Sequence, residues 1–200
     1  MLRLLMIGLI FAPAASADEK NQFALAAPAD WGGETIKLPP GFARDMKWRG
    51  VEHIRFAPGM MQANSDTFFC YAFAFELDRN TDLTQEAVTA EFLKYYRGLC
   101  SAVAGAKIPD LDTSKFSFKL EPTKTKPTAL ADVKEIHYTG VLDWIEPFAT
   151  RKPQKLNVEI QTWKDDHHGY LFAGVSPQAT DAVIWNQLHK IRDDYVSKSK

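Results

Sequence analysis

Residues Phe68–Leu77 read FFCYAFAFEL, a short run of aromatic and small residues between the polar turns Asn64–Asp66 and Asp78–Asn80. A run this short and apolar is typical of a strand that is buried on both faces inside a sheet. Because side chains alternate along a strand, one face carries aromatic rings and the other carries small residues: Phe69, Tyr71, Phe73 and Phe75 against Cys70, Ala72 and Ala74. Small residues allow close packing, so we expect the helix that follows the strand to cover the small face. The aromatic face then needs another cover or is itself a binding surface.

The remaining chain predicts an α+β domain around this strand. Apolar residues recur at helical spacing from Thr84 to Cys100, and a second amphipathic helix is expected from about Asp181, with Thr180 as its N-cap. Alternating or apolar runs predict strands at residues 34–42, 50–56, 115–120, 133–145, 156–163 and 170–175. The order β-β-β-α-β-β-β-β-α, with short connections, predicts a mainly antiparallel sheet of about seven strands with two helices.

The N-terminus has the features of a signal peptide. Arg3 precedes an apolar core at Leu4–Ala12, and Ala15–Ala17 provides small residues for cleavage after Ala17. The apolar core is shorter than the about 20 residues that span a bilayer. We therefore expect a periplasmic or secreted protein, with a signal peptide at 1–17, a flexible mature N-terminus at 18–30 and a single domain at 31–200.

The composition narrows the class of partner. The formal net charge is −1 for the whole chain and becomes −2 when Arg3 is removed with the signal peptide. A charge this close to zero argues against nucleic acid or an anionic membrane surface as the main partner. No second apolar run is long enough to cross a membrane, so the mature chain is expected to be soluble. No cofactor motif is present, and the expected partner is an unknown small molecule or protein.

The two cysteines predict a disulfide. Cys70 and Cys100 belong to a chain expected in an oxidising compartment. If the helix packs antiparallel to the strand on its small face, Cys100 returns to the level of Cys70. Two buried free thiols are the alternative. A nucleophilic Cys100 is disfavoured, because the C-terminus of a helix raises a thiol pKa.

Two resemblances bear on the fold. The run Gly33–Phe42, GETIKLPPGF, followed by Arg55–Met60 and the aromatic strand, resembles that of a family of secreted bacterial proteins, and this resemblance implies no activity. The Leu38-Pro39-Pro40 opening, the meander and the closing helix are similar in element order to the PsbP/Mog1-type α+β fold. That similarity implies an accessory or binding module rather than an enzyme, and it identifies no functional residue.

No catalytic or metal motif is present, but three polar sets deserve comparison. His137 with Asp143, or Glu52 with His53, would suit a hydrolase-like enzyme if the side chains met as an acid–base pair. A solvated polar face of the sheet is the alternative. The run Asp165–His168 offers oxygen and imidazole ligands for a metal, although adjacent residues rarely converge on one ion and a polar hairpin turn explains them as well.

The aromatic residues provide the preferred candidate for a ligand or partner surface. Trp163 lies in the polar register of its predicted strand, alongside Glu159 and Gln161. Together with an uncovered face at Phe69, Tyr71, Phe73 and Phe75, it could line a groove. Ordinary core is the more common arrangement, since a bulge would turn Trp163 inward and another segment could cover the rings. The sequence thus predicts an exported binding or accessory domain without an identifiable catalytic site.

Overall fold

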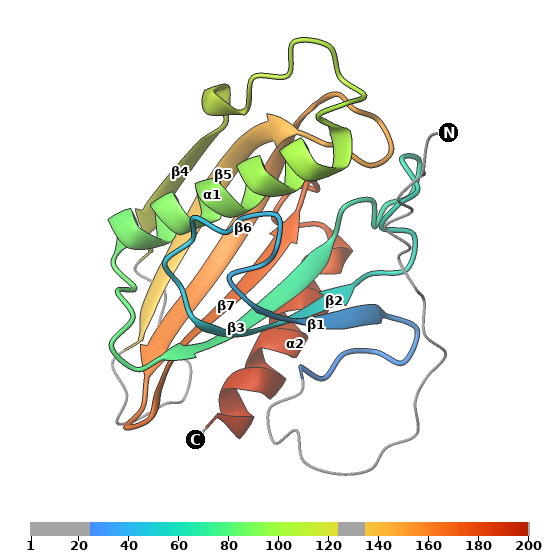
Figure 1. Cartoon of the computed structure of the whole chain (residues 1–200). Coiled ribbons are helices and arrows are strands. Elements are labelled where there is room, and N and C mark those ends of the chain that lie inside the picture. The colour runs from blue at the N-terminus through green and yellow to red at the C-terminus, as the bar shows by residue number, and fades with distance from the viewer. Residues whose placement is uncertain (1–24, 124–134, 200) are drawn as a thin grey trace.

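The computed structural model describes residues 25–123 and 135–199 (Figure 1). The predicted signal peptide and residues 18–24 of the predicted N-terminal tail lie outside this range. The predicted element order is confirmed. The strands are β1 (Gly32–Leu38), β2 (Gly50–Phe56), β3 (Tyr71–Asp78), β4 (Ser117–Pro122), β5 (Ile136–Ile145), β6 (Pro153–Lys164) and β7 (His168–Ser176), and the helices are α1 (Gln85–Ala104), α2 (Val183–Lys198) and the short 3-10 turn Thr113–Lys115.

All seven strands form one antiparallel sheet in the order β1-β2-β3-β7-β6-β5-β4. β3 lies between β2 and β7, which confirms the interior strand that its sequence predicts. Its residues are buried on both faces, with Ala72 and Ala74 fully enclosed and Phe73 and Phe75 almost so. The apolar run at 68–77 therefore supplies an interior strand of the sheet, next to the middle strand β7.

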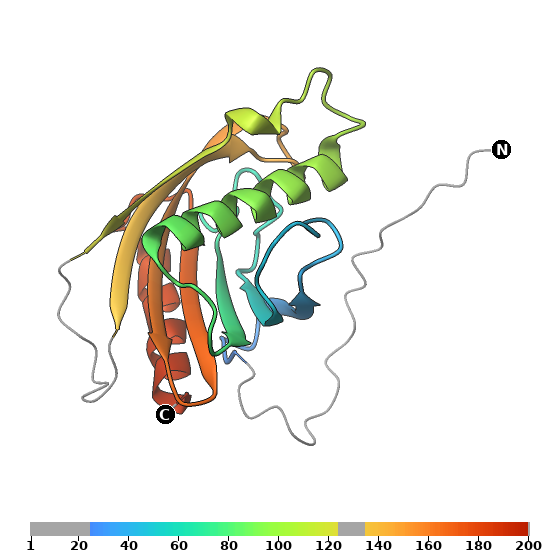
Figure 2. The ribbon, with the colours of Figure 1, turned by 60° about the vertical axis from the view of Figure 1, so that its left-hand side comes forward.

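The two helices cover opposite faces of the sheet (Figures 1 and 2). α1 packs on the aromatic face, where the Phe92 ring lies 6.3 Å from Phe73 and the Tyr95 ring 5.5 Å from Phe73. α2 packs on the small face, in one cluster with Cys70, Ala72 and Ala74. The prediction that α1 covers the small face is therefore wrong. Each face needs a helix, and the rings of Phe92 and Tyr95 fill the spaces between the aromatic rings, whereas the small face admits the bulky Trp185 of α2.

The predicted disulfide between Cys70 and Cys100 is also wrong, because the sheet separates the two thiols. Both cysteines are free and buried. Cys70 lies under α2, with its sulfur 3.0 Å from the Ser176 hydroxyl, and Cys100 faces the other side of the sheet with the core beneath α1. The predicted bridge requires both cysteines to lie on one face of the sheet, and they lie on opposite faces.

Local signals explain the ends of the helices. The Thr84 hydroxyl accepts a hydrogen bond from the Ala87 backbone N–H and caps α1, at the residue where the helical spacing begins. α2 begins at Val183, after Ala182 rather than the predicted Thr180, and has no side-chain cap. Within the described ranges, neither helix is both long enough and apolar enough to span a membrane.

Candidate functional site

The aromatic face of the sheet is not filled completely by α1, and a cavity of about 80 Å³ remains beside the helix. We call this cavity the aromatic pocket. Seven aromatic side chains line it, drawn from β2, β3, α1 and the connecting loops: Phe42, Phe56, Phe69, Tyr71, Phe73, Tyr95 and Phe148. The other lining residues are aliphatic or methionine, with Glu34 as the single charged residue: Glu34, Ile36, Ile54, Met60, Met61 and Leu99. The predicted surface residues Phe69, Tyr71 and Phe73 thus meet in one pocket.

Two backbone features hold loop residues in the wall of the pocket. Phe69 has a positive φ of 54°, a conformation that costs energy for a residue with a bulky side chain. Gly98 allows the Phe42 loop to approach α1, because a Cβ at Gly98 would lie 2.2 Å from the Phe42 carbonyl oxygen. Phe42 then contacts Tyr95 edge to face, with ring centroids 5.0 Å apart.

A buried carboxyl group, that of Glu52, adjoins the pocket. Glu52 is fully buried and lies across the sheet from Ile36 and two residues before Ile54, both of which line the pocket. Burial raises the pKa of Glu52 from 4.5 to about 8, the Tyr95 hydroxyl lowers it, and the charge of Glu34 raises it further. Among the described residues, neither Glu52 oxygen has a hydrogen-bond partner at normal distance and angle. Glu52 is therefore a mainly protonated acid at neutral pH.

Three tyrosines surround this carboxyl group. The Tyr71 and Tyr96 hydroxyls lie 2.5 Å apart and bond to each other, which leaves the Tyr95 hydroxyl to act on Glu52. Burial, with the charge of Glu52 as a further cause, raises the pKa of all three phenols above the usual value of 10. The tyrosines consequently remain neutral in the pH range where Glu52 changes charge.

The other predicted surface residues belong to the core. Phe75 lies under Trp48 and Phe92, outside the pocket. Trp163 is 3% exposed and stacks on Tyr170 at 5.3 Å on the opposite face of the sheet from the pocket. No bulge is needed to bury it, because Tyr195 of α2 covers this end of β6.

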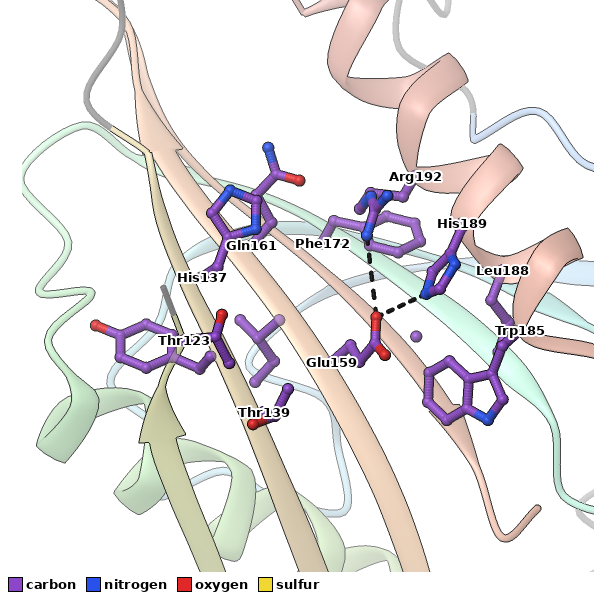
Figure 3. A pocket seen from close by; sticks show the side chains of 13 residues that line it. Thr123, His137, Thr139, Glu159, Gln161, Phe172, Trp185, Leu188, His189 and Arg192 are labelled. Atoms are coloured by element: carbon purple, nitrogen blue, oxygen red, sulfur yellow. Dashed lines mark hydrogen bonds and ion pairs between the residues drawn. The ribbon is translucent and has the colours of Figure 1, made fainter. Parts of the chain in front are cut away.

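A second concave site, the polar groove, lies on the other face of the sheet, between β5, β6 and α2 (Figure 3). It encloses about 90 Å³. Most of its lining residues are polar or charged, and Tyr138, Phe172 and Trp185 add aromatic rings: Thr123, His137, Tyr138, Thr139, Glu159, Ile160, Gln161, Phe172, Gly174, Trp185, Leu188, His189 and Arg192.

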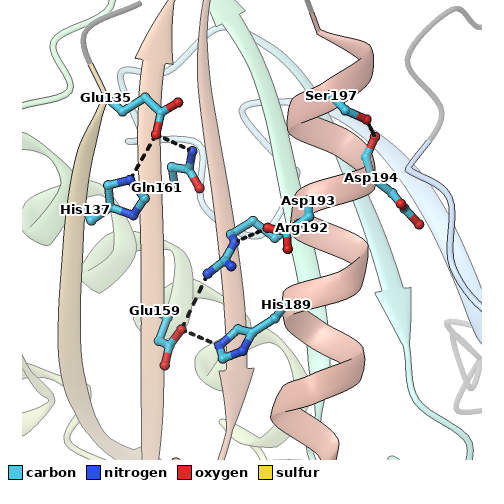
Figure 4. Close-up of polar contacts among 9 residues, drawn as sticks. All are labelled: Glu135, His137, Glu159, Gln161, His189, Arg192, Asp193, Asp194 and Ser197. Atoms are coloured by element: carbon cyan, nitrogen blue, oxygen red, sulfur yellow. Dashed lines mark hydrogen bonds and ion pairs between the residues drawn. The ribbon is translucent and has the colours of Figure 1, made fainter. Parts of the chain in front are cut away.

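Two imidazole–carboxylate pairs lie at this groove (Figure 4). His137 Nε2 is 3.1 Å from Oε2 of the nearly buried Glu135, which also accepts a hydrogen bond from the Gln161 amide. On the α2 side, His189 Nε2 is 2.7 Å from Glu159 Oε2, and Arg192 is 3.9 Å from the same oxygen. A carboxylate that holds one ring nitrogen orients the other one, which is a common arrangement for binding and for proton transfer.

The predicted acid–base pairs are not assembled. Asp143 forms an ion pair with Lys155, and His137 pairs with Glu135 instead. Glu52 and His53 point to opposite faces of β2, where His53 contacts the Thr35 hydroxyl at 3.0 Å. β2 and β5 are not neighbouring strands, so these two sets do not meet.

Asp165–His168 forms the hairpin turn between β6 and β7. The Asp165 carboxylate accepts hydrogen bonds from the backbone N–H groups of His167 and His168, at 2.7 and 2.6 Å, and from the Tyr170 hydroxyl. Across the described parts of the chain, no group of three or more His, Cys, Asp or Glu side chains is arranged to hold a metal ion.

Sequence reasoning named Glu52 and His137 as candidates but missed the residues that act on them in the structure, Tyr95 and Glu135. Glu52 alternates with Ile54 and Phe56 along β2, so the sequence places it in an otherwise apolar row. Tyr95, whose hydroxyl acts on Glu52, lies on α1, the helix that the sequence predicts on the other face of the sheet. His189 carries no sequence signal, since it sits at the edge of the apolar stripe of α2. Comparisons with protein-family models, curated proteins and solved structures gave no match to this chain.

Proposed function

We propose that this protein is an exported binding domain and that a small molecule occupies the aromatic pocket. The observation that carries the proposal is the pocket itself, a cavity of about 80 Å³ with seven aromatic side chains, near a buried carboxyl group whose pKa is raised. Apolar pockets with a few polar groups of shifted pKa are typical ligand sites. Export is inferred from the signal-peptide features of residues 1–17.

Binding is favoured over catalysis by the chemistry of the pocket. The described lining contains no Ser, Cys, His or Lys, and Glu34 is its one carboxylate. The Tyr71 and Tyr95 hydroxyls are buried phenols whose pKa is raised, so they remain neutral donors. The pocket can therefore enclose an apolar group and hydrogen-bond a polar one, without a group that is suited to attack it.

Native mass spectrometry of the protein purified from the periplasm, without chelator or reductant, tests this function. We expect a species that carries the extra mass of a small molecule. Leu99 lines the pocket on α1, so Leu99→Trp should fill the cavity and remove the extra mass. Leu93, a partly buried residue of α1 outside the pocket lining, gives the matched control Leu93→Trp, which should retain it.

A bare chain in the wild-type protein, or extra mass that both Trp variants retain, would contradict ligand binding in the aromatic pocket. Thermal unfolding of both variants, followed by circular dichroism, provides the necessary check that each one is folded. A stable Leu99→Trp protein without the adduct is the result that supports the pocket.

A second candidate function, acid–base catalysis, is favoured by the pairing of His137 with Glu135 in the polar groove. The hydroxyl groups in its described lining belong to Thr and Tyr, which makes a covalent hydrolase less suitable than proton transfer to a bound substrate. NMR titration of the histidine ring protons tests it. Coupled titration of His137 with a carboxylate, abolished in Glu135→Gln, is expected for an acid–base pair, and an unchanged His137 titration in that variant contradicts it.

A further inference from the structure

We infer that the aromatic pocket binds the end of an alkyl chain, about three carbon atoms long, from a ligand whose polar end is not an anion. This inference rests on the proposed binding function of the pocket and adds the chemical class of its ligand. Three features support it: the volume of the cavity, the contacts that fix this volume, and the placement of polar and charged groups around it.

The volume limits what can enter the pocket. The cavity measures about 80 Å³, which is about half of the roughly 150 Å³ of a cavity that admits benzene. It also exceeds the roughly 30 Å³ that one water molecule occupies in the liquid. A benzene-sized ring is therefore too large, whereas an alkyl end with about half of the carbon atoms of benzene has the appropriate size.

Contacts among the lining rings fix this volume. Six of the seven aromatic rings follow one another in a continuous series of ring contacts, with centroid distances from 4.9 to 6.0 Å: Phe42 with Tyr95, Tyr95 with Phe73, Phe73 with Tyr71, Tyr71 with Phe69, and Phe69 with Phe148. Each ring in the series is held by at least one other, so a larger cavity would require these contacts to separate. The pocket is therefore expected to select its ligand by size.

The inner wall of the pocket has no polar group that requires a polar ligand. Its two hydroxyl groups already have polar neighbours, since the Tyr71 hydroxyl bonds to that of Tyr96 at 2.5 Å and the Tyr95 hydroxyl acts on Glu52. Apart from Glu34, the other lining residues have hydrocarbon or thioether side chains. An alkyl group that enters the pocket is removed from water, and no polar group of the wall loses a hydrogen bond in exchange.

The charge of the pocket lies at its mouth. Glu34 and Met61 are the exposed members of the lining and therefore mark the opening. Glu34 is also the one charged residue of the described lining, which contains no Lys, Arg or His. A ligand whose alkyl end fills the cavity has its polar end beside this carboxylate, which repels a carboxylate or phosphate and accepts a hydrogen bond from a hydroxyl group. Primary alcohols are therefore suitable probes of the inferred class.

A series of primary alcohols from ethanol to hexan-1-ol tests the length of the alkyl end. Binding is measured at pH 7 from the ¹³C-methyl methionine spectrum, in which Met60 and Met61 line the pocket and the buried Met46, outside the lining, is the internal reference. We expect the affinity to rise about fourfold with each carbon up to about three or four carbons, because each further CH₂ is buried. Beyond this length the added carbons lie outside the mouth, and the affinity should rise by less than about twofold per carbon. Phenol should not shift Met60 or Met61 at concentrations at which butan-1-ol saturates the shifts.

Leu99 provides a variant that changes the volume. Leu99→Ala removes most of a side chain that lines the pocket, so the break in the series should move to longer alcohols and phenol should bind. The control Leu93→Ala makes the same substitution at a partly buried position of α1 outside the lining, and should leave the break unchanged. Thermal unfolding followed by circular dichroism checks that both variants are folded, and the wild-type series alone decides the outcome if either is not.

A second pair of probes tests the charge at the mouth. Butanoate has as many carbon atoms as butan-1-ol and carries a carboxylate in place of the hydroxyl end. Glu34→Gln should tighten butanoate binding about two- to fivefold and leave butan-1-ol binding nearly unchanged, because only butanoate is repelled by the Glu34 carboxylate. The exposed Glu121 on β4 gives the control Glu121→Gln, which should change neither affinity.

The outcomes separate the inference from the proposed function. If phenol binds as tightly as butan-1-ol, or if the affinity keeps rising about fourfold per carbon up to hexan-1-ol, the pocket is a ligand site but does not select a short alkyl end. Equal binding of butanoate to the wild type and to Glu34→Gln would overturn the inference about the polar end. If no alcohol shifts Met60 or Met61, the whole inference is refuted, and the adduct measured with Leu99→Trp decides the proposed function independently.

Discussion

Replacing Glu52 by glutamine should change how the stability of the protein depends on pH. Glu52 is fully buried, and its pKa is raised from 4.5 to about 8 by that burial. Between these two pH values, the folded state keeps a proton that the unfolded state releases. Stability therefore falls as pH rises through this window, and becomes constant again above pH 8. Glutamine cannot ionise, so this contribution is absent in Glu52→Gln.

The size of the effect follows from the two pKa values. Each tenfold difference in proton affinity corresponds to about 1.4 kcal/mol. Between pH 5 and pH 9, the wild type should lose about 4 kcal/mol of unfolding free energy that Glu52→Gln does not lose. A loss of this size is a large part of the about 5–15 kcal/mol that stabilises a typical domain.

Urea unfolding at one-unit intervals from pH 5 to pH 9, followed by tryptophan fluorescence, measures the effect. The quantity of interest is the difference in unfolding free energy between Glu52→Gln and the wild type at each pH, because contributions from other titrating groups are common to both proteins. Among these is His53 on the same strand, whose pKa is lowered by burial. The exposed Glu121 on β4 provides the control Glu121→Gln, which should give a difference that does not vary with pH.

A flat difference for Glu52→Gln would refute the reasoning. It would mean that the Glu52 carboxyl has an ordinary pKa and is solvated or paired in the folded protein. A difference that rises in favour of Glu52→Gln from about pH 5 and levels off near pH 8 is the predicted curve, and the pH at which it levels off reports the pKa of the carboxyl in the folded protein.

Three further predictions concern the core. Under denaturing conditions without reductant, a thiol assay should count two free thiols, and in the native protein Cys70 and Cys100 should react slowly, because burial raises the pKa of each to about 11. Trp163→Ala should cost about 3–5 kcal/mol in urea unfolding, since the indole stacks on Tyr170 in the core; a loss below 1 kcal/mol would show that the side chain is not core. Glu146→Gln should cost about 2–3 kcal/mol, because its carboxylate accepts the backbone N–H groups of residues 148–150, and equal stability would contradict that role.

The order of the elements could be predicted from the sequence, but the pairing of faces could not. Period-two and helical patterns report the local backbone, which is why the strand at 68–77 and the sheet around it were predicted correctly. Which helix covers which face depends on contacts between distant residues. Phe92 of α1 contacts Phe73, and Trp185 of α2 packs in one cluster with Cys70, Ala72 and Ala74. Neither contact has a signature in the local sequence.

The errors at the sites have the same cause. Trp163 lies in the polar register of β6, and its burial depends on Tyr195, far along the chain. His137 was matched with Asp143 because both face the same side of β5, whereas its partner Glu135 immediately precedes the strand. A rule based on residue spacing ranks the first pair as highly as the second, and only the arrangement in space separates them.

The comparison of buried carboxyl groups supports a ligand at the aromatic pocket. Glu91 and Glu146 are as deeply buried as Glu52, and both are satisfied: Glu91 accepts the Lys47 N–H and the Lys94 ammonium at 2.6 Å each, and Glu146 accepts three backbone N–H groups. Glu52 has no comparable partner among the described residues. The Tyr95 hydroxyl acts on it without reaching normal hydrogen-bond geometry, so Glu52 is the least satisfied of the three buried carboxyl groups. A weakly satisfied buried acid next to residues that line a pocket is the feature that we expect a bound ligand to complete.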